Sequence, residues 1–130
     1  LKGNEKILVV EDDDLVRKII VSALSNYRYN LFSADGGEEA AKVCSENRDI
    51  DLIICDVVMP GMDGRQVAAV LLAYCPNAKV LYMSGYTNNV IAHHHILDKD
   101  VDFIEKPFTP QMIGKKVREV LDRDKNGERI

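Results

Sequence analysis

Five short, continuous runs of apolar residues alternate with longer amphipathic stretches along this chain of 130 residues. The runs are rich in β-branched residues, the second is the weakest, and they lie at residues 7–10, 31–32, 52–55, 80–83 and 101–104. Because polarity does not alternate within a run, the runs are typical of strands covered on both faces. Strand–helix alternation repeated five times predicts an α/β fold with a doubly wound parallel sheet and five helices on both faces.

The stretches between the runs carry the apolar periodicity of helices. In the first stretch an apolar stripe is expected from Leu15, Val16, Ile19, Ile20, Ala23 and Leu24. A third helix should end before Pro76, and a fourth is expected at roughly residues 88–97. Helix N-caps are expected from Asp13 or Asp14, from Asp35 and from Thr109, the last with Pro110 in its first turn.

Composition narrows the classes of function. A net charge of −4 without a basic stripe argues against direct nucleic-acid binding, and the lack of a long apolar run argues against membrane contact. No leader-like segment is evident, and Cys44, Cys55 and Cys75 have neither metal-site nor redox-motif spacing, so buried thiols and a cytoplasmic location are expected. We predict one domain over residues 1–123 and a polar tail or linker start over 124–130.

Polar residues follow four of the five apolar runs. Glu11 and Asp12 follow the first run, Asp56 the third, Ser84 the fourth, and Lys106 comes just after the fifth. Because parallel strands end at one edge of a sheet, we expect these side chains to meet there. Each residue alone has an ordinary explanation as a helix cap, a turn residue or a surface lysine, but complementary groups at four strand ends predict a site.

The chemistry of that group points to a cation and a phosphoryl group. Neighbouring carboxylates repel one another, and a hard divalent cation such as Mg²⁺ relieves the repulsion with oxygen ligands. A cation alone would not require Ser84 and Lys106, whose hydroxyl and ammonium suit an incoming dianionic phosphoryl group. An aspartate can accept that group as an acyl phosphate, so Asp56 is the candidate acceptor.

Four motifs then carry a family resemblance. They are ILVVEDD at residues 7–13, DVVMPGMDG at 56–64, MSGY at 83–86 and KPF at 106–108. Together they resemble the response regulator receiver (CheY-like) family of two-component systems, over about residues 6–122. SGYT at 84–87 and KPFTP at 106–110 are most similar to receivers at the C-terminus of hybrid sensor histidine kinases, which a start without Met also fits. A stand-alone regulator is the alternative context.

The resemblance implies a fold and a set of residue roles. The fold would be flavodoxin-like, with a five-stranded sheet of order 2-1-3-4-5. Asp56 would be the phosphoacceptor, and Mg²⁺ (or Mn²⁺) would be held by Glu11 through water, by Asp12 and Asp56, and by the Val58 backbone carbonyl. Ser84 and Lys106 would contact the phosphoryl group, Phe103 would be the aromatic switch residue, and the bond before Pro107 would be cis.

The resemblance also implies partners and a readout. A sensor histidine kinase or a histidine phosphotransfer protein would donate the phosphoryl group, and the domain would promote its own aspartyl phosphorylation and dephosphorylation. Movement of Ser84 and Phe103 would change the face formed by the fourth helix, fifth strand and fifth helix, where a phosphorylation-dependent homodimer is expected. Val58, Gly85 and Tyr86 would flank access to the acyl phosphate.

Two other functions are open to this sequence. An aspartyl-phosphate phosphatase typically has a second Asp two residues after its nucleophile, where this chain has Val58. A degenerate receiver would act as a phosphate-independent binding module, against which Asp12, Asp56, Ser84 and Lys106 argue together. The run His93 to His95 is interpreted as a solvated, partly helical loop, because consecutive residues point to different sides of a helix and chelate poorly.

Overall fold

The computed structural model describes residues 4–59, 62–84 and 102–123. The described elements are β1 Lys6–Val10, α1 Asp14–Leu24, β2 Asn30–Ala34, α2 Gly37–Glu46, β3 Leu52–Asp56, β4 Val58–Met59, β5 Met62–Asp63, α3 Gly64–Tyr74, β6 Lys79–Ser84, β7 Asp102–Glu105 and α5 Pro110–Leu121. The expected helix at roughly 88–97, the histidine run and the predicted tail at 124–130 lie outside the described residues.

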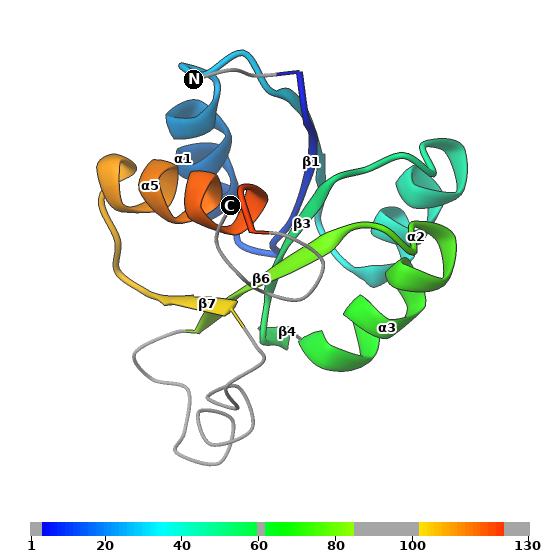
Figure 1. The fold of residues 1–130 in the computed structure, drawn as a ribbon. Coiled ribbons are helices and arrows are strands. Elements are labelled where there is room, and N and C mark those ends of the chain that lie inside the picture. Colours follow the sequence, from blue (N-terminus) through cyan, green and yellow to red (C-terminus); the bar gives the residue numbers. More distant parts are fainter. Residues whose placement is uncertain (1–3, 60–61, 85–101, 124–130) are drawn as a thin grey trace.

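Five strands form one parallel sheet in the order β2-β1-β3-β6-β7 (Figure 1). This is the 2-1-3-4-5 order of the doubly wound fold, so the predicted fold class is confirmed. The register pairs Val10 with both Ala34 and Cys55, and it pairs Asp56 with Met83. The carboxyl ends of the neighbouring strands therefore lie along one edge of the sheet.

The position of each strand explains its sequence. All five residues of central β3 are buried, as are four of the five in β1. β2 and β7 are edge strands, and each has only one buried residue. An edge strand buries less of its surface, which explains why the second apolar run was the weakest of the five.

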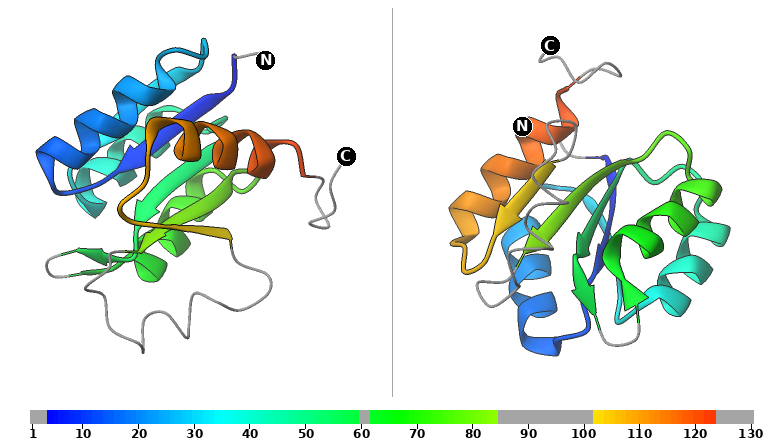
Figure 2. Two further views of the ribbon diagram at one scale, coloured as in Figure 1. Left: turned by 90° about the vertical axis from the view of Figure 1, so that its left-hand side faces the viewer. Right: turned by 90° about the horizontal axis from the view of Figure 1, so that it is seen from below.

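Helices cover both faces of the sheet (Figure 2). α1 and α5 pack on one face, where Ile20, Leu24, Ile113 and Val117 share a core with Ile7 and Val9 of β1. α2 and α3 pack on the other face, where Cys44, Val67 and Leu71 share a core with Leu8 and Val10. Successive β1 residues thus point into opposite layers, as the two-residue period of a strand requires. Among the described helices, none combines the length and apolarity needed to span a membrane.

Only part of the apolar stripe predicted on α1 is buried. Ile20, Ala23 and Leu24 are buried, but Leu15 is 68% exposed and Ile19 is 44% exposed. The buried side of α1 faces the sheet and α5, and Leu15 and Ile19 lie outside that contact. Periodicity identified an apolar helix, whereas the packing partners decided which of its apolar residues are covered.

The helix caps agree with the sequence in part. Asp13 is the N-cap of α1, and its Oδ1 accepts from the backbone N–H groups of Leu15 and Val16 at 2.9 and 3.1 Å. Thr109 caps α5 with Pro110 at its first position. Asp35, in contrast, does not cap α2: the N-cap is Gly36, which offers no side chain.

A short antiparallel hairpin of β4 and β5 follows β3 and was not predicted. It brings the start of α3 back against the end of β3, where the Gly64 N–H donates to the Val57 carbonyl at 2.7 Å. A Cβ on Gly64 would lie 2.1 Å from the Asp56 carbonyl oxygen and 2.7 Å from the Val57 Cα. Glycine is therefore required at position 64 by the close approach of two backbone segments.

Candidate functional site

Four strand ends deliver polar side chains to one edge of the sheet. Glu11 directly follows β1, Asp56 ends β3, Ser84 ends β6, and Lys106 directly follows β7. Glu11, Asp56 and Ser84 are only 1%, 5% and 1% exposed. Polar groups are rarely buried to this extent without partners or function, so the burial marks this edge as the candidate site.

Three carboxylates meet at this edge. One oxygen from each of Glu11, Asp12 and Asp56 lies within 4.8 Å of the others. Although Asp12 as a residue is exposed, partial burial of its carboxyl raises its pKa, and the adjacent Glu11 carboxylate raises it further. Within the described residues this acidic cluster has the donor set and spacing of a hard-cation site.

Lys106 is the counter-charge of the cluster. Its Nζ lies 2.9 Å from Oε1 of Glu11 and 3.0 Å from Oδ2 of Asp56. Burial by itself would lower the pKa of the Lys106 ammonium, but hydrogen bonds to Glu11 and Asp56 outweigh it and raise the pKa. The side chain therefore stays charged and bridges two buried carboxylates.

The hydroxyl of Ser84 is buried at this edge of the sheet. Its Oγ is buried and has no hydrogen-bond partner among the described residues. The Lys106 N–H donates to the Ser84 carbonyl at 2.8 Å, which holds the backbones of the two residues together. A buried hydroxyl without a partner costs free energy, so its presence beside Asp56 and Lys106 favours a ligand that accepts or donates a hydrogen bond there.

The loop after β1 is held by contacts that the sequence analysis missed. The Asp13 N–H donates to Oε2 of Glu11 at 3.0 Å, and Nη1 of Arg17 donates to the Glu11 carbonyl at 2.8 Å. Arg17 also forms an ion pair with the Asp14 carboxylate. The only sequence signal for this role was the three-residue spacing of Asp14 and Arg17 on one helix face.

The remaining predicted residues differ in how far the structure describes them. Phe103 lies in β7, is half-buried, and packs against the small cluster of Val57, Ala68 and Tyr82. The Lys106–Pro107 peptide bond is cis. Val58 begins β4, two residues beyond Asp56. Gly85 and Tyr86 lie outside the described residues.

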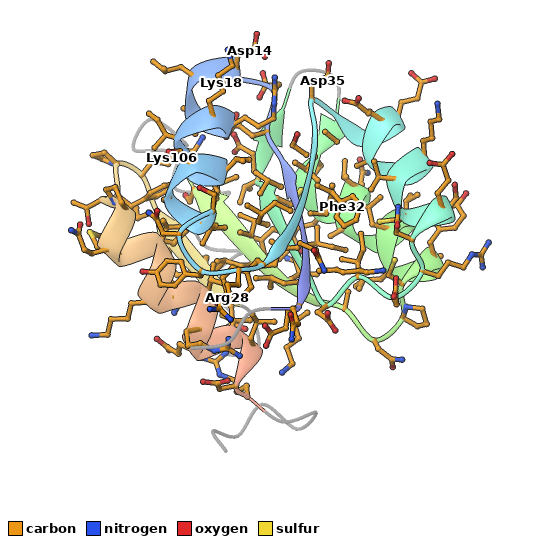
Figure 3. The ribbon with its side chains drawn as sticks, turned by 90° about the horizontal axis from the view of Figure 1, so that it is seen from above. Asp14, Lys18, Arg28, Phe32, Asp35 and Lys106 are labelled. Atoms are coloured by element: carbon orange, nitrogen blue, oxygen red, sulfur yellow. The ribbon has the colours of Figure 1, made fainter. Side chains whose placement is uncertain are left out.

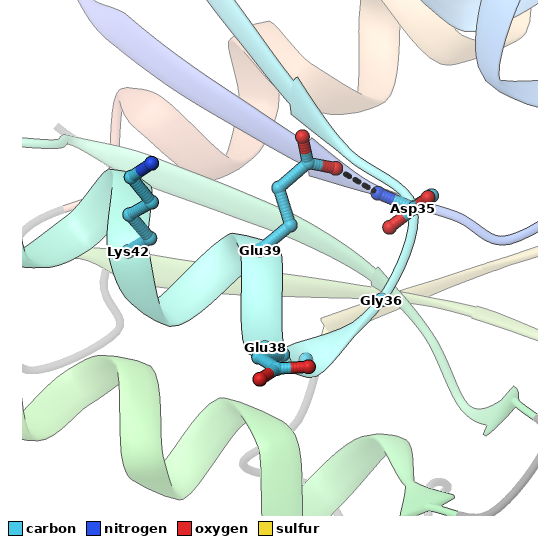
Figure 4. Close-up of a pocket in the computed structure, with 6 residues that line it drawn as sticks. Asp35, Gly36, Glu38, Glu39 and Lys42 are labelled. Atoms are coloured by element: carbon cyan, nitrogen blue, oxygen red, sulfur yellow. Dashed lines mark hydrogen bonds between the residues drawn. The ribbon is translucent and has the colours of Figure 1, made fainter.

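A separate shallow pocket lies at the start of α2 (Figure 4). It has a volume of about 570 Å³ and is lined by Asp35, Gly36, Gly37, Glu38, Glu39 and Lys42. The Asp35 N–H donates to Oε1 of Glu39 at 2.9 Å, so the first turn of α2 is tied back to the end of β2. None of these residues belongs to the acidic cluster, so the candidate site is the strand-end group rather than this pocket.

Comparison with known proteins agrees with the fold. A family model described as the response regulator receiver domain matches residues 7–118, most of the chain. The chain belongs to this family. A receiver domain is the phosphorelay switch of two-component signalling, and the acidic cluster of this receiver lies at the sheet edge described above.

Two relatives are similar to this receiver over most of its length. It is 34% identical over 124 residues to the sensor kinase CckA of Brucella abortus, a match covering 95% of this chain and 13% of that protein. It is 32% identical to the aerobic respiration control protein ArcA of Escherichia coli, covering 92% and 50%. The receiver thus spans at most half the length of these two relatives.

Solved structures show the same fold. The receiver domain from the hybrid histidine kinase CckA matches with a TM-score of 0.74 and 32% identity, covering 89% of this chain and 98% of that one. A CheY-like receiver from Methanospirillum hungatei matches with a TM-score of 0.79 and 24% identity, covering 92% and 95%.

Proposed function

We propose that Asp56 is the acceptor of a phosphoryl group from a phosphohistidine donor. The observation that carries the proposal is the contact between Oδ2 of Asp56 and Nζ of Lys106 at 3.0 Å, at the same sheet edge as the buried Ser84 hydroxyl, which has no partner among the described residues. A carboxylate acceptor, a fixed cation and a hydroxyl donor together suit the transfer of a dianionic phosphoryl group to an aspartate.

The residues of the acidic cluster fit a divalent cation. Glu11, Asp12 and Asp56 offer oxygens within 4.8 Å of one another, and the raised pKa of Asp12 reflects in part repulsion that a cation would relieve. Asp12 and Asp56 would bind Mg²⁺ or Mn²⁺ directly, Glu11 through a water, and Val58 through its backbone carbonyl. When bound, the ion neutralises charge on the transferring phosphoryl group.

The residues of the chain supply positioning and charge in the transfer. An oxygen of Asp56 forms the new bond to phosphorus as the bond from phosphorus to the donor imidazole nitrogen breaks, and the imidazole keeps that electron pair. Lys106 and the Ser84 hydroxyl then pair with the phosphoryl oxygens. Burial of Asp56 and Ser84 strengthens these interactions, because electrostatic attraction is stronger away from bulk water.

We propose that the phosphohistidine donor binds to the exposed apolar surface formed by α1 and α5. Leu15, Ile19 and Met112 are 68%, 44% and 48% exposed. A groove of about 300 Å³ beside them is lined by Lys18, Ile19, Ser22, Ala23, Asn26 and Pro110. A donor must bring its histidine to Asp56, and a helical phosphohistidine protein with an apolar face fits this surface.

Replacing Leu15 and Ile19 by Glu should slow transfer from such a protein while leaving phosphorylation by acetyl phosphate intact.

Phosphorylation would be read out through β6 and β7. Ser84 ends β6, and Phe103 pairs with Tyr82 of the same strand. Attraction of Ser84 to the phosphoryl group would vacate space, allow Phe103 to turn inward and change the surface around β7 and α5, where a homodimer would form. The parent protein would be a cytoplasmic hybrid histidine kinase or a stand-alone regulator, and three buried free thiols suit that reducing compartment.

Intact mass tests the proposal directly. The receiver is incubated with Mg²⁺ and acetyl phosphate beside two variants, Asp56→Asn and Asp35→Asn. Asp35 is the matched control, an exposed aspartate directly after β2 that lines the separate pocket. Gain of one phosphoryl group in wild type and Asp35→Asn is the expected result, with no gain in Asp56→Asn or when EDTA is added before the donor. No gain in folded wild type would favour the phosphate-independent binding module.

A further inference from the structure

We propose that Arg17 is a positioning residue that sets the divalent-cation affinity of the acidic cluster by holding the backbone of Glu11. This inference rests on the cation site proposed above. Arg17 is not a ligand candidate, since its guanidinium is always positively charged. Its influence would act entirely through the loop between β1 and α1, which carries both Glu11 and Asp12.

The guanidinium of Arg17 joins two parts of this loop. Nη1 donates to the Glu11 carbonyl at 2.8 Å, and Nη2 pairs with the Asp14 carboxylate. The Arg17 side chain is 18% exposed, whereas the Asp14 side chain is 76% exposed, so the contact with Glu11 is on the protected side. The planar guanidinium can donate to the Glu11 carbonyl and the Asp14 carboxylate at once, because its N–H groups are held at fixed angles.

Loss of this contact would loosen the cluster at its centre. Glu11 is 1% exposed, and its carboxylate is already engaged, with Oε1 bound by Lys106 and Oε2 by the Asp13 N–H. Without Arg17 the buried Glu11 carbonyl loses its hydrogen bond from the guanidinium. The adjacent Asp12 would then be held less firmly, and ligand oxygens must be placed within about 0.5 Å to bind a metal well.

When Arg17 is replaced, the lost charge and the lost positioning should change the divalent-cation affinity in opposite directions. Removing a cation near an acidic cluster should by itself strengthen the binding of a divalent ion. Removing a group that orients the loop should weaken binding, as loss of outer contacts at metal sites typically does by roughly 10–100-fold. The direction of the change therefore separates a positioning role from a purely electrostatic one.

The neighbouring Lys18 supplies the matched control. It lies on α1 one residue after Arg17 (Figure 3) and is exposed. It lines the groove that includes Pro110. Lys18→Ala removes the same charge from the same turn of helix. Arg17→Lys keeps the charge but replaces the fork with a single ammonium group.

The experiment is Mn²⁺ binding, followed by the electron paramagnetic resonance of the free ion, with folding checked by circular dichroism. Arg17→Ala and Arg17→Lys should both weaken binding, Arg17→Ala by about tenfold, while Lys18→Ala should leave it unchanged or strengthen it. Wild-type affinity or tighter binding in Arg17→Lys would overturn the inference, and Arg17→Lys decides if Arg17→Ala does not fold. Failure of wild type itself to bind Mn²⁺ would instead overturn the proposed cation site.

Discussion

Nζ of Lys106 lies 2.9 Å from Oε1 of Glu11 and 3.0 Å from Oδ2 of Asp56, so a single ammonium group bridges two buried carboxylates. The bridge joins the ends of β1, β3 and β7, three strands of the five-stranded sheet. It stabilises the cluster when no cation is bound, and it also places Lys106 where a phosphoryl group on Asp56 would be neutralised.

Replacing Lys106 by Met should destabilise the domain most when Mg²⁺ is absent. Breaking a buried ion pair typically costs roughly 3–5 kcal/mol, and we expect the lower end of this range. The Lys106 side chain is 22% exposed and so retains some hydration. Saturating Mg²⁺ should recover part of the loss, because the ion takes over the neutralisation of Glu11 and Asp56.

Urea unfolding with and without Mg²⁺ measures the effect of Lys106→Met. Lys116→Met is the control, since Lys116 pairs with Glu119 at 3.6 Å with both side chains 26% exposed. A pair of this kind contributes at most about 1 kcal/mol. An equal deficit for Lys106→Met in both conditions would show that the ammonium does not neutralise the carboxylates that we propose as cation ligands.

Gly64→Ala should destabilise the domain and displace Asp56. The added methyl group would meet backbone atoms of Asp56 and Val57, which have little freedom to move. Overpacking of this kind typically costs about 1–3 kcal/mol, and acetyl phosphate labelling should fall with it.

Gly114→Ala is the comparison for Gly64→Ala. There the nearest atom is the Tyr27 hydroxyl oxygen at 2.7 Å, the far end of a side chain. A helix gains roughly 0.5–1 kcal/mol when Ala replaces an interior Gly, which should offset the displacement of Tyr27. Thermal unfolding should show a clearly smaller loss for Gly114→Ala, and equal losses would count against the backbone clash at Gly64.

The buried thiols should be unreactive in the native state. Burial raises the pKa of Cys55 to about 12, and the charges of Asp56, Glu11 and Asp63 add to this. Burial and the neighbouring Cys75 likewise raise the pKa of Cys44 to about 12. At pH 8 both thiols are therefore protonated, so an aromatic disulfide reagent should label them only after unfolding.

The raised pKa values of the two thiols also make the stability of the fold depend on pH, because the folded chain favours the protonated thiols. The pKa of each thiol is higher in the folded chain than its ordinary value of 9.0, so the stabilisation is complete below about pH 9 and is lost as pH rises through about 12. Labelling of the folded protein should rise over the same interval. Rapid labelling of native Cys44 or Cys55 at pH 8 would contradict the burial of these side chains.

The lifetime of the acyl phosphate should depend on Val58 and Tyr86. Our expectation from the sequence is that apolar or bulky residues at these positions hinder an attacking water. Val58→Asn combined with Tyr86→Glu should therefore speed loss of the phosphoryl group, measured by intact mass after the donor is removed. Val70→Asn, which changes a 47% exposed valine on α3, serves as the control. Equal lifetimes in all three proteins would refute the expectation.

Local patterns predicted the fold class and most of its elements. Continuous apolar runs identified the strands, amphipathic stretches identified α1, α3 and α5, and the Thr109–Pro110 pair marked the start of α5. These features depend on periodicity and on capping, which involve residues only a few positions apart. The exposure of Leu15 and Ile19 could not be predicted in this way, because it depends on what packs beside α1. Nor was the start of α2 at Gly37 predicted, which makes Gly36 rather than Asp35 the N-cap.

The sequence by itself determined which chemical groups stand at the strand ends, since Glu11, Asp56 and Ser84 directly follow apolar runs and Lys106 comes two residues after the last run. Only the tertiary structure decided their distances. Lys106 and Glu11 are 95 residues apart and meet because the strand order places their ends at one edge. The contact of Arg17 with the Glu11 carbonyl was likewise invisible in the sequence, because a backbone acceptor has no residue type to recognise.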